Sequence, residues 1–252
     1  MNEKEQDILS IRLSTESFKY AVFNPFQENI PETMTWKTEP SISLTANFKK
    51  FLHDKEDLGG YQKVNVAIES SRYVAIPMEL FDDEQAKLIF YHNLPEQENE
   101  TILYYILHSI NVVIIYSIDT STYQLVLSKY PNAKFFVHIC PFIEFFAARS
   151  HQGNNKKMYV NLRNDALDII CLDHGRLLLA NSYNCRETDD RMYYLMYVWE
   201  HINFDQELDE MQIIGNIPEK DQLINKIDKF IRHRYILNNS IEAEIKLVWK
   251  CG

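Results

Sequence analysis

The most constraining feature of this sequence is an internal repeat with a spacing of 149 residues. Positions 9–23 read LSIRLSTESFKYAVF, and positions 158–172 read MYVNLRNDALDIICL. Both segments alternate apolar and polar residues on either side of a short polar break, and their apolar positions coincide. Alternation with a period of two indicates half-buried β-strands, and a short break indicates a tight hairpin. The sequence therefore predicts the same β-hairpin twice.

The residues after each hairpin repeat the same order of predicted elements: a third strand, a helix, a strand and a further helix. In the first copy we predict strands over 32–37 and 64–69 and a helix over 43–54 that begins after Ser43. In the second copy we predict strands over 176–183 and 211–215, a helix over 188–202 and a helix from Pro218. Apolar spacing directs five residues of that last helix inward: Leu223, Ile224, Ile227, Phe230 and Ile231.

The first copy is longer because it carries an insertion at about residues 72–118. The apolar stretch 102–118 belongs to it, and polar residues such as Asn111 interrupt that stretch, whereas a membrane helix needs about 20 apolar residues. We therefore expect two adjacent buried segments and no membrane insertion. A helix over 119–130 and a strand over 134–139 return the chain to the first sheet, and Pro141 opens a helix. The predicted domains are 1–139 and 140–252.

The excess of acidic residues argues against two classes of partner. Against 36 Asp and Glu there are 26 Lys and Arg, so the formal net charge is −10. Nucleic acids and anionic membrane surfaces both attract clustered cations, so we expect binding to neither. One short basic cluster, residues 232–234, is interpreted as complementing the dipole at a helix end. The N-terminal sequence MNEKEQDILSIRL does not resemble a signal peptide, which indicates a cytoplasmic protein.

The cysteines and histidines form two close pairs, Cys171 with His174 and His138 with Cys140. A structural zinc site uses four ligands, typically in two close pairs with finger-like spacing, which these pairs do not have. We therefore expect buried, reduced thiols and no metal site. The first strand of each copy lacks a carboxylate, so the two-metal chemistry of nucleases has no support either.

The doubled β-β-β-α-β-α unit resembles the actin-like ATPase superfamily, whose two lobes each have a ribonuclease H-like core. The successive motifs IRLSTESFKYAVF, YVAIPMELFDDEQA, YVNLRNDALDIICLDHGRLLLANSY and IIGNIPE resemble an uncharacterised bacterial family of unknown function with that fold. PilM-type pilus assembly proteins are more distantly similar. The resemblance implies an α/β fold with two ribonuclease H-like lobes, 1–139 and 140–252.

The resemblance also implies where a nucleotide would bind. The superfamily's two phosphate loops lie in the repeated hairpins, and an adenosine motif follows the fourth strand of the second lobe. By position, the implied contacts in this chain are Ser14, Thr15, Arg163, Asn164 and Gly215. The loops usually carry Asp-x-Gly, but LSTES and LRNDA here contain no glycine, so side chains obstruct the backbone approach to phosphate. Gly215 is either a remnant of the adenosine motif or a turn before Pro218.

Two functions remain open from the sequence. The first is a non-catalytic scaffold or protein-binding module with a degenerate nucleotide site, no cofactor and a protein partner, since PilM-type relatives bind partner peptides. The alternative is a divergent nucleotide-binding ATPase or small-molecule kinase that uses ATP with Mg²⁺. The C-terminal residues 241–249 alternate apolar and polar side chains. This predicts a strand that pairs with its own sheet or forms a homodimer.

Overall fold

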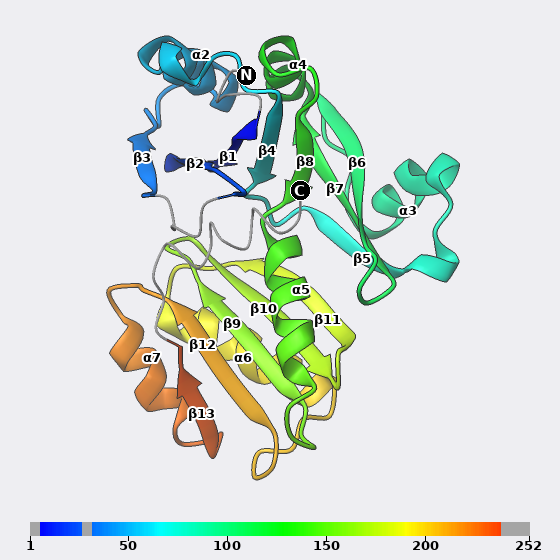
Figure 1. The fold of residues 1–252 in the computed structure, drawn as a ribbon. Helices are drawn as coiled ribbons and strands as arrows, with labels where there is room; N and C mark the ends of the chain where they lie inside the picture. The colour runs from blue at the N-terminus through cyan, green and yellow to red at the C-terminus, as the bar shows by residue number, and fades with distance from the viewer. Residues whose placement is uncertain (1–5, 27–31, 238–252) are drawn as a thin grey trace. The chain divides into compact units, whose positions relative to one another are not determined.

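Two five-stranded sheets form the framework of the protein, and both have the same strand order (Figure 1). In the computed structural model, which describes residues 6–26 and 32–237, the orders are β3-β2-β1-β4-β8 and β11-β10-β9-β12-β13. In each sheet the first three strands form an antiparallel meander, and the last two run parallel to the central strand. The predicted α/β fold with two lobes is confirmed.

The elements of the two sheets follow one another in the same sequence. The first sheet and its helices comprise β1 (Ile8–Leu13), β2 (Ser17–Phe23), β3 (Met34–Lys37), α2 (Leu44–Asp54), β4 (Lys63–Ile68), α4 (Thr120–Lys129) and β8 (Lys134–Val137). After α5 (Ile139–Ser150), the second comprises β9 (Lys157–Leu162), β10 (Ala166–Asp173), β11 (Arg176–Asn184), α6 (Thr188–His201), β12 (Glu210–Gly215), α7 (Lys220–Ile227) and β13 (His233–Ile236).

The strand register repeats as well as the strand order. Leu13 faces Phe18 across the first hairpin, and 149 positions later Leu162 faces Leu167 across the second. A one-residue slip would turn every apolar side chain of a strand to the opposite face. The shared register therefore follows from the shared apolar pattern, and the sequence repeat is a structural repeat.

The described residues form two compact units. The first comprises residues 6–26, 32–106 and 113–141, and the second comprises 107–112 and 142–237. The predicted lobe boundary between residues 139 and 140 stays a prediction. The predicted strand at 241–249, and with it the predicted homodimer contact, lies outside the described residues.

The core of the first unit lies between one face of its sheet and the helices α2 and α4. The hydroxyl of Ser43 accepts a hydrogen bond from the amide of Ala46, which confirms the predicted N-terminus of α2. Phe51 on this helix is fully buried, and its ring lies 5.6 Å from that of Phe18 on β2. Helix and sheet thus meet through aromatic side chains.

The second unit has helices on both faces of its sheet (Figure 1). On one face, α6 and α7 supply buried residues such as Trp199 and Leu223 to the core. On the other face, Phe146 of α5 stacks on Tyr159 of β9 with ring centroids 4.0 Å apart. The central strand β9 is therefore buried along its whole length.

Three details of the second copy differ from the sequence interpretation. Phe230 is 49% exposed, because α7 ends at Ile227 and the chain then turns toward β13. The basic cluster 232–234 enters β13 and does not lie at a helix end; Arg234 forms an ion pair with Asp228 at 2.7 Å. Helix α5 begins at Ile139, so Pro141 lies within its first turn, where a missing N–H costs no hydrogen bond.

The insertion forms a small sheet of its own. Strands β5 (Tyr73–Pro77), β7 (Val112–Asp119) and β6 (Glu100–Leu107) pair in that order, and α3 (Ala86–Asn93) contributes Phe90 to their core. The two predicted apolar segments are β6 and β7; β7 is almost entirely buried, whereas most of β6 is half buried. None of the helices in the described part of the chain combines the length and hydrophobicity that a bilayer crossing requires.

An ion pair connects the start of the insertion to its hairpin. Arg72 donates hydrogen bonds of 2.6 and 2.9 Å to the carboxylate of Glu100, and Ser117 donates one of 2.8 Å. Burial acts to raise the pKa of Glu100, but the hydrogen bonds from Arg72 and Ser117 outweigh burial and lower the pKa below its usual 4.5. The ionised form of Glu100 therefore stabilises the folded state.

This contact predicts an acid dependence of stability. Because the folded-state pKa is lowered, the stabilisation is complete above pH 4.5 and is lost as the pH falls through the folded-state value. Glu100→Gln should cost about 1–3 kcal/mol at pH 7 and should lose less stability than the wild type between pH 5 and pH 3, measured by urea unfolding. Glu84→Gln, at an exposed position, is the control. Equal acid sensitivity of the Glu100 variant and the wild type would contradict the assignment.

Candidate functional site

In the first repeated hairpin, the side chain of Ser14 hydrogen-bonds to the backbone of the turn. The hydroxyl of Ser14 donates to the carbonyl of Ser17 at 2.9 Å and accepts from the amides of Ser17 and Glu16 at 3.1 and 3.3 Å. Thr15 is exposed at the tip, and its carbonyl accepts a hydrogen bond of 2.6 Å from Thr38. Two amides of the kind that could bind an anion in a turn are therefore bonded to Ser14.

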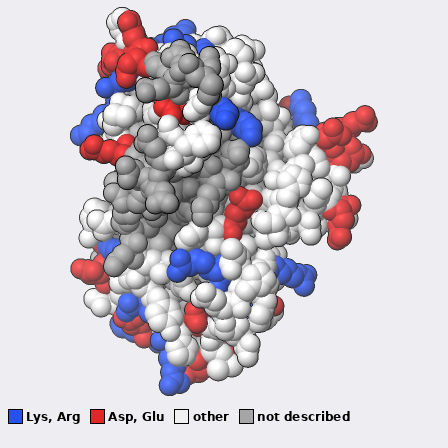
Figure 2. Space-filling model, viewed as in Figure 1, with Lys and Arg blue, Asp and Glu red and all other residues white. Residues whose placement is uncertain are grey.

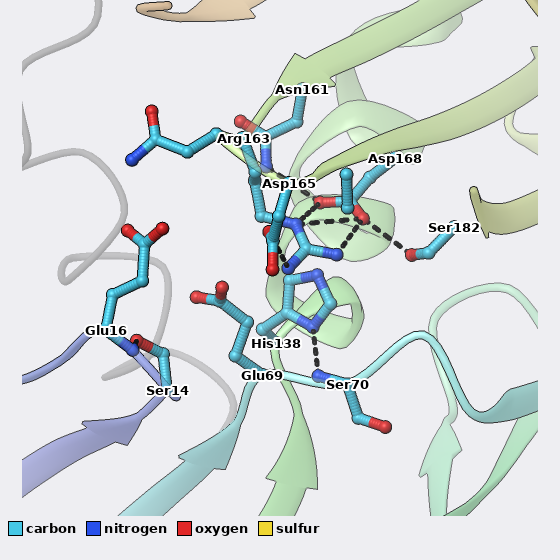
Figure 3. Close-up of polar contacts among 12 residues, drawn as sticks. Ser14, Glu16, Glu69, Ser70, His138, Asn161, Arg163, Asp165, Asp168 and Ser182 are labelled. Atoms are coloured by element: carbon cyan, nitrogen blue, oxygen red, sulfur yellow. Dashed lines mark hydrogen bonds and ion pairs between the residues drawn. The ribbon is translucent and has the colours of Figure 1, made fainter. Parts of the chain in front are cut away.

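The second hairpin contains a buried ion pair. Arg163 donates to Asp168 through Nη2 at 3.0 Å and through Nε at 3.1 Å, and the Asp168 side chain has no exposed area. Asn161 and Ser182 donate to the same carboxylate at 2.8 and 2.6 Å (Figure 3). A buried carboxylate is stable only when its oxygens are satisfied in this way. The predicted phosphate contact Arg163 thus has an intramolecular anionic partner.

A second arginine holds the backbone of this hairpin. Arg191 on α6 is 1% exposed and donates to the carbonyls of Arg163 and Asn164 at 2.9 Å each. It also donates to the carbonyls of Ala166 and Arg186, both at 3.2 Å. The guanidinium therefore satisfies backbone carbonyls of the turn that are not paired within the hairpin itself. We call the hairpin residues 161–168 with Arg191 and Ser182 the arginine-held hairpin.

The structure explains why a glycine stands at position 215. It ends β12 with φ +88° and lies opposite Leu162 of β9. A Cβ atom at this position would lie 2.2 Å from the Leu162 carbonyl oxygen. The carbonyl of Gly215 accepts a 2.7 Å hydrogen bond from the side chain of Lys220. Only glycine tolerates this conformation and this close approach. Close strand approach is a sufficient reason for this glycine, independent of any ligand.

A polar cluster lies at the carboxyl ends of the parallel strands of the first sheet. Arg12 on β1 donates to Glu69, which follows β4, at 2.8 and 3.0 Å. The next residue, Ser70, donates its amide to Nδ1 of His138, which follows β8, at 3.4 Å (Figure 3). The carboxyl ends of parallel strands are a common ligand position in α/β folds, and here ion-paired and hydrogen-bonded side chains occupy it.

The five predicted residues are thus distributed over the two units. Ser14 and Thr15 lie in the first hairpin, and Arg163, Asn164 and Gly215 lie together at one end of the second sheet. The sequence interpretation missed Asp168 and Arg191, which bond to the second hairpin, and it missed the ion pair between Arg12 and Glu69 in the first unit. A partial signal existed for Arg12 and Asp168, which are charged residues within mostly apolar strands, whereas the sequence gives no sign that Arg191 contacts the hairpin.

The thiols within the described part of the chain are buried. Burial raises the pKa of the Cys171 thiol well above its usual value, and the predicted burial of this residue is confirmed. Cys140 and Cys185 are also buried. Among the described residues, no three His, Cys, Asp or Glu side chains are grouped so that they could hold a metal ion.

Replacing Arg191 with methionine should destabilise the second unit strongly. Three hairpin carbonyls would lose their buried donor, and unsatisfied buried groups cost about 1–3 kcal/mol each, so we expect a loss of at least about 3 kcal/mol in urea unfolding. Amide hydrogen exchange across residues 162–167 should also become faster. Arg186→Met, at an exposed position nearby, is the matched control and should be nearly neutral. Equal stability of the two variants would show that Arg191 does not hold the hairpin.

Comparison with known proteins places this geometry in a family. Residues 1–233 match the family described as "Protein of unknown function (DUF3822)". No curated protein matches the sequence. A crystal structure from Bacteroides thetaiotaomicron, described as a protein with actin-like ATPase fold and unknown function, is similar with 44% identity and a TM-score of 0.94. The similarity covers 99% of this chain and 97% of that one.

A more distant solved structure is similar in fold alone. It is a PilM–PilN type IV pilus biogenesis complex, with 11% identity and a TM-score of 0.57 over 97% of this chain and 89% of that one. Both the family and the distant similarity to PilM were expected from the order of sequence motifs. The chain belongs to the DUF3822 family of proteins of unknown function, and its fold is that of the actin-like ATPases.

Proposed function

We propose that this protein is a non-catalytic binding module that recognises a protein partner in the cytoplasm. The observation that carries the proposal is the arginine-held hairpin. Of its two basic side chains, Arg191 donates to the hairpin carbonyls and Arg163 pairs with the buried Asp168. A phosphate group at this hairpin would have to compete with a buried, hydrogen-bonded carboxylate for Arg163.

The first hairpin supports the same function for a different reason. Its amides at Glu16 and Ser17 are bonded to the Ser14 hydroxyl, and it contains no glycine that would let a phosphate approach the backbone. A fold that retains both sheets while its hairpin amides are bonded within the turn supports a binding function. The PilM relative was solved in a complex with PilN, which supports a protein as the partner here.

The surface charge agrees with a protein partner better than with nucleic acid. The net charge is −10, and Figure 2 shows Lys and Arg interspersed with Asp and Glu over the face in view, without an extended basic stripe. Phosphate-backbone binding depends on such a stripe.

The alternative, a divergent nucleotide-binding ATPase or small-molecule kinase that uses ATP with Mg²⁺, has one observation in its favour. Thr15 and Asn164 are exposed at the tips of their hairpins. Their side chains, unlike those of Ser14 and Arg163, could contact a phosphate group without disrupting the hydrogen bonds described above.

Nucleotide titration separates the two functions. Millimolar ATP, ADP or GTP with Mg²⁺ should leave the thermal unfolding midpoint unchanged. A ligand at 100 times its Kd adds about 2.7 kcal/mol, which for a chain of this length is a shift of roughly 5–10 °C. A dose-dependent shift that tripolyphosphate does not reproduce, and that Thr15→Ala or Asn164→Ala abolishes, would replace the proposed function with the alternative.

A positive test of the binding function uses the full chain in cells of its source organism. In-cell crosslinking followed by mass spectrometry should repeatedly recover one protein at a fixed set of crosslinked sites, and the purified pair should co-elute in size-exclusion chromatography. Arg191→Met, which disturbs the hairpin, serves as a folding-sensitive comparison. Repeated failure to recover any partner, together with a monomeric chain, would contradict a binding module.

A further inference from the structure

An apolar groove on the second unit is not used by either hairpin. It lies between α6 and the turn after α7 and has a volume of about 360 Å³. Two methionines form its floor, Met192 and Met196, and three aromatic side chains line it: Tyr193, Tyr197 and Phe230. The aromatic side chains are 63%, 49% and 49% exposed, respectively. We call this feature the α6 groove.

The aromatic side chains of the groove are ordered by contacts with one another. Tyr193 stacks on Tyr197 with centroids 6.1 Å apart, and Tyr197 stacks on His201 at 5.6 Å. The four-residue spacing places these rings in one row along α6. Exposed Tyr side chains provide rigid contact area with little loss of conformational entropy on binding, which is why they are enriched at protein interfaces.

Both charged residues that line the groove are acidic, and one of them already has a cationic partner. Within the described residues, its lining includes the carboxylates of Asp189 and Glu200 and no Lys or Arg. The carboxylate of Asp189 forms an ion pair with Lys226 of α7. The two acids lie at opposite ends of α6, about 16 Å apart along the helix axis. An occupant would therefore meet an apolar floor with the Lys226–Asp189 ion pair at one end and the carboxylate of Glu200 at the other.

We propose that the α6 groove is the docking site for a basic amphipathic helix of a protein partner. Methionine side chains adapt to the shape of an apolar face, the tyrosine faces attract Lys and Arg, and the carboxylate of Glu200 pairs with a cation at its end of the groove. A span of about 16 Å matches roughly three turns of helix, which is typical of helix-in-groove recognition. This inference rests on the proposed binding function and names its surface and partner chemistry.

Two synthetic helices test the charge and the apolar requirements together. Both are about 15 residues long with Leu and Phe on one face; one carries Lys on the opposite face and the other carries Glu. The Lys peptide should bind the full chain with a Kd below about 100 µM, measured by fluorescence anisotropy, and the Glu peptide should bind at least tenfold more weakly. Binding should weaken as the salt concentration rises.

Paired variants locate the binding. Tyr193→Ser with Tyr197→Ser should raise the Kd of the Lys peptide at least tenfold, whereas Tyr104→Ser, an exposed aromatic of the insertion, should not change it. Glu200→Lys should weaken the Lys peptide several-fold and strengthen the Glu peptide. Glu84→Lys, at an exposed acidic residue of the first unit, is its control. Each variant's thermal midpoint confirms that it is folded.

Other outcomes overturn the inference. Equal weakening by Glu84→Lys and Glu200→Lys would mean that the peptide is attracted only by the net charge. Concentration-dependent dimerisation that the double Tyr variant abolishes would assign the groove to a second copy of this chain. No binding of either peptide up to about 1 mM would reject the helix occupant. None of these results bears on the nucleotide titration, so failure of this inference and failure of the proposed function are distinguishable.

Discussion

The contacts between Arg191 and the β9–β10 hairpin connect helix α6 to the sheet of the second unit. A tight hairpin directs several carbonyls to one side, and in this chain a buried guanidinium satisfies three of them within the turn and one beyond it. Arg191 comes from the first turn of α6, so the same contact fixes the start of the helix against the sheet. The position of α6 then sets the α6 groove on its outer surface. The hairpin, the helix and the groove therefore depend on one side chain.

The two copies of the fold satisfy an equivalent polar residue of the central strand with different partners. Counting 149 residues from Arg12 gives Asn161, and both side chains hydrogen-bond a buried or half-buried carboxylate. In the first unit that carboxylate is Glu69, after the fourth strand, and in the second it is Asp168, on the neighbouring strand. Each sheet thus has the same backbone arrangement, while its polar side chains hydrogen-bond to partners that differ between the two copies. This separation of fold from site chemistry is consistent with a family that shares the actin-like fold without a function evident from the fold.

The sequence predicted the backbone better than the site, for physical reasons. Period-two alternation at Leu13 and Leu162 reports burial directly, so strands, register and repeat could be derived. A residue such as Arg191 carries no such signal, because its partners are backbone carbonyls of a hairpin distant in sequence. The four-residue strand β13 was missed since residues 232–234 are basic and its pairing with β12 is non-local. Phe230 was misplaced because helical spacing continues past the point where α7 ends.

Strand β13 has a consequence for how the protein stays dispersed in a crowded cell. Among the described strands it is the outermost of the second sheet, and its outward hydrogen-bonding groups are a template for aggregation. Arg234 lies within it and is tied to Asp228, while Arg232 next to it is paired with Glu207. Charged side chains held at a sheet margin oppose the addition of a foreign strand. Arg232 and Arg234 place charge of this kind at the margin of the second sheet, so one and the same pair of arginines ties down local carboxylates and disfavours edge-to-edge pairing.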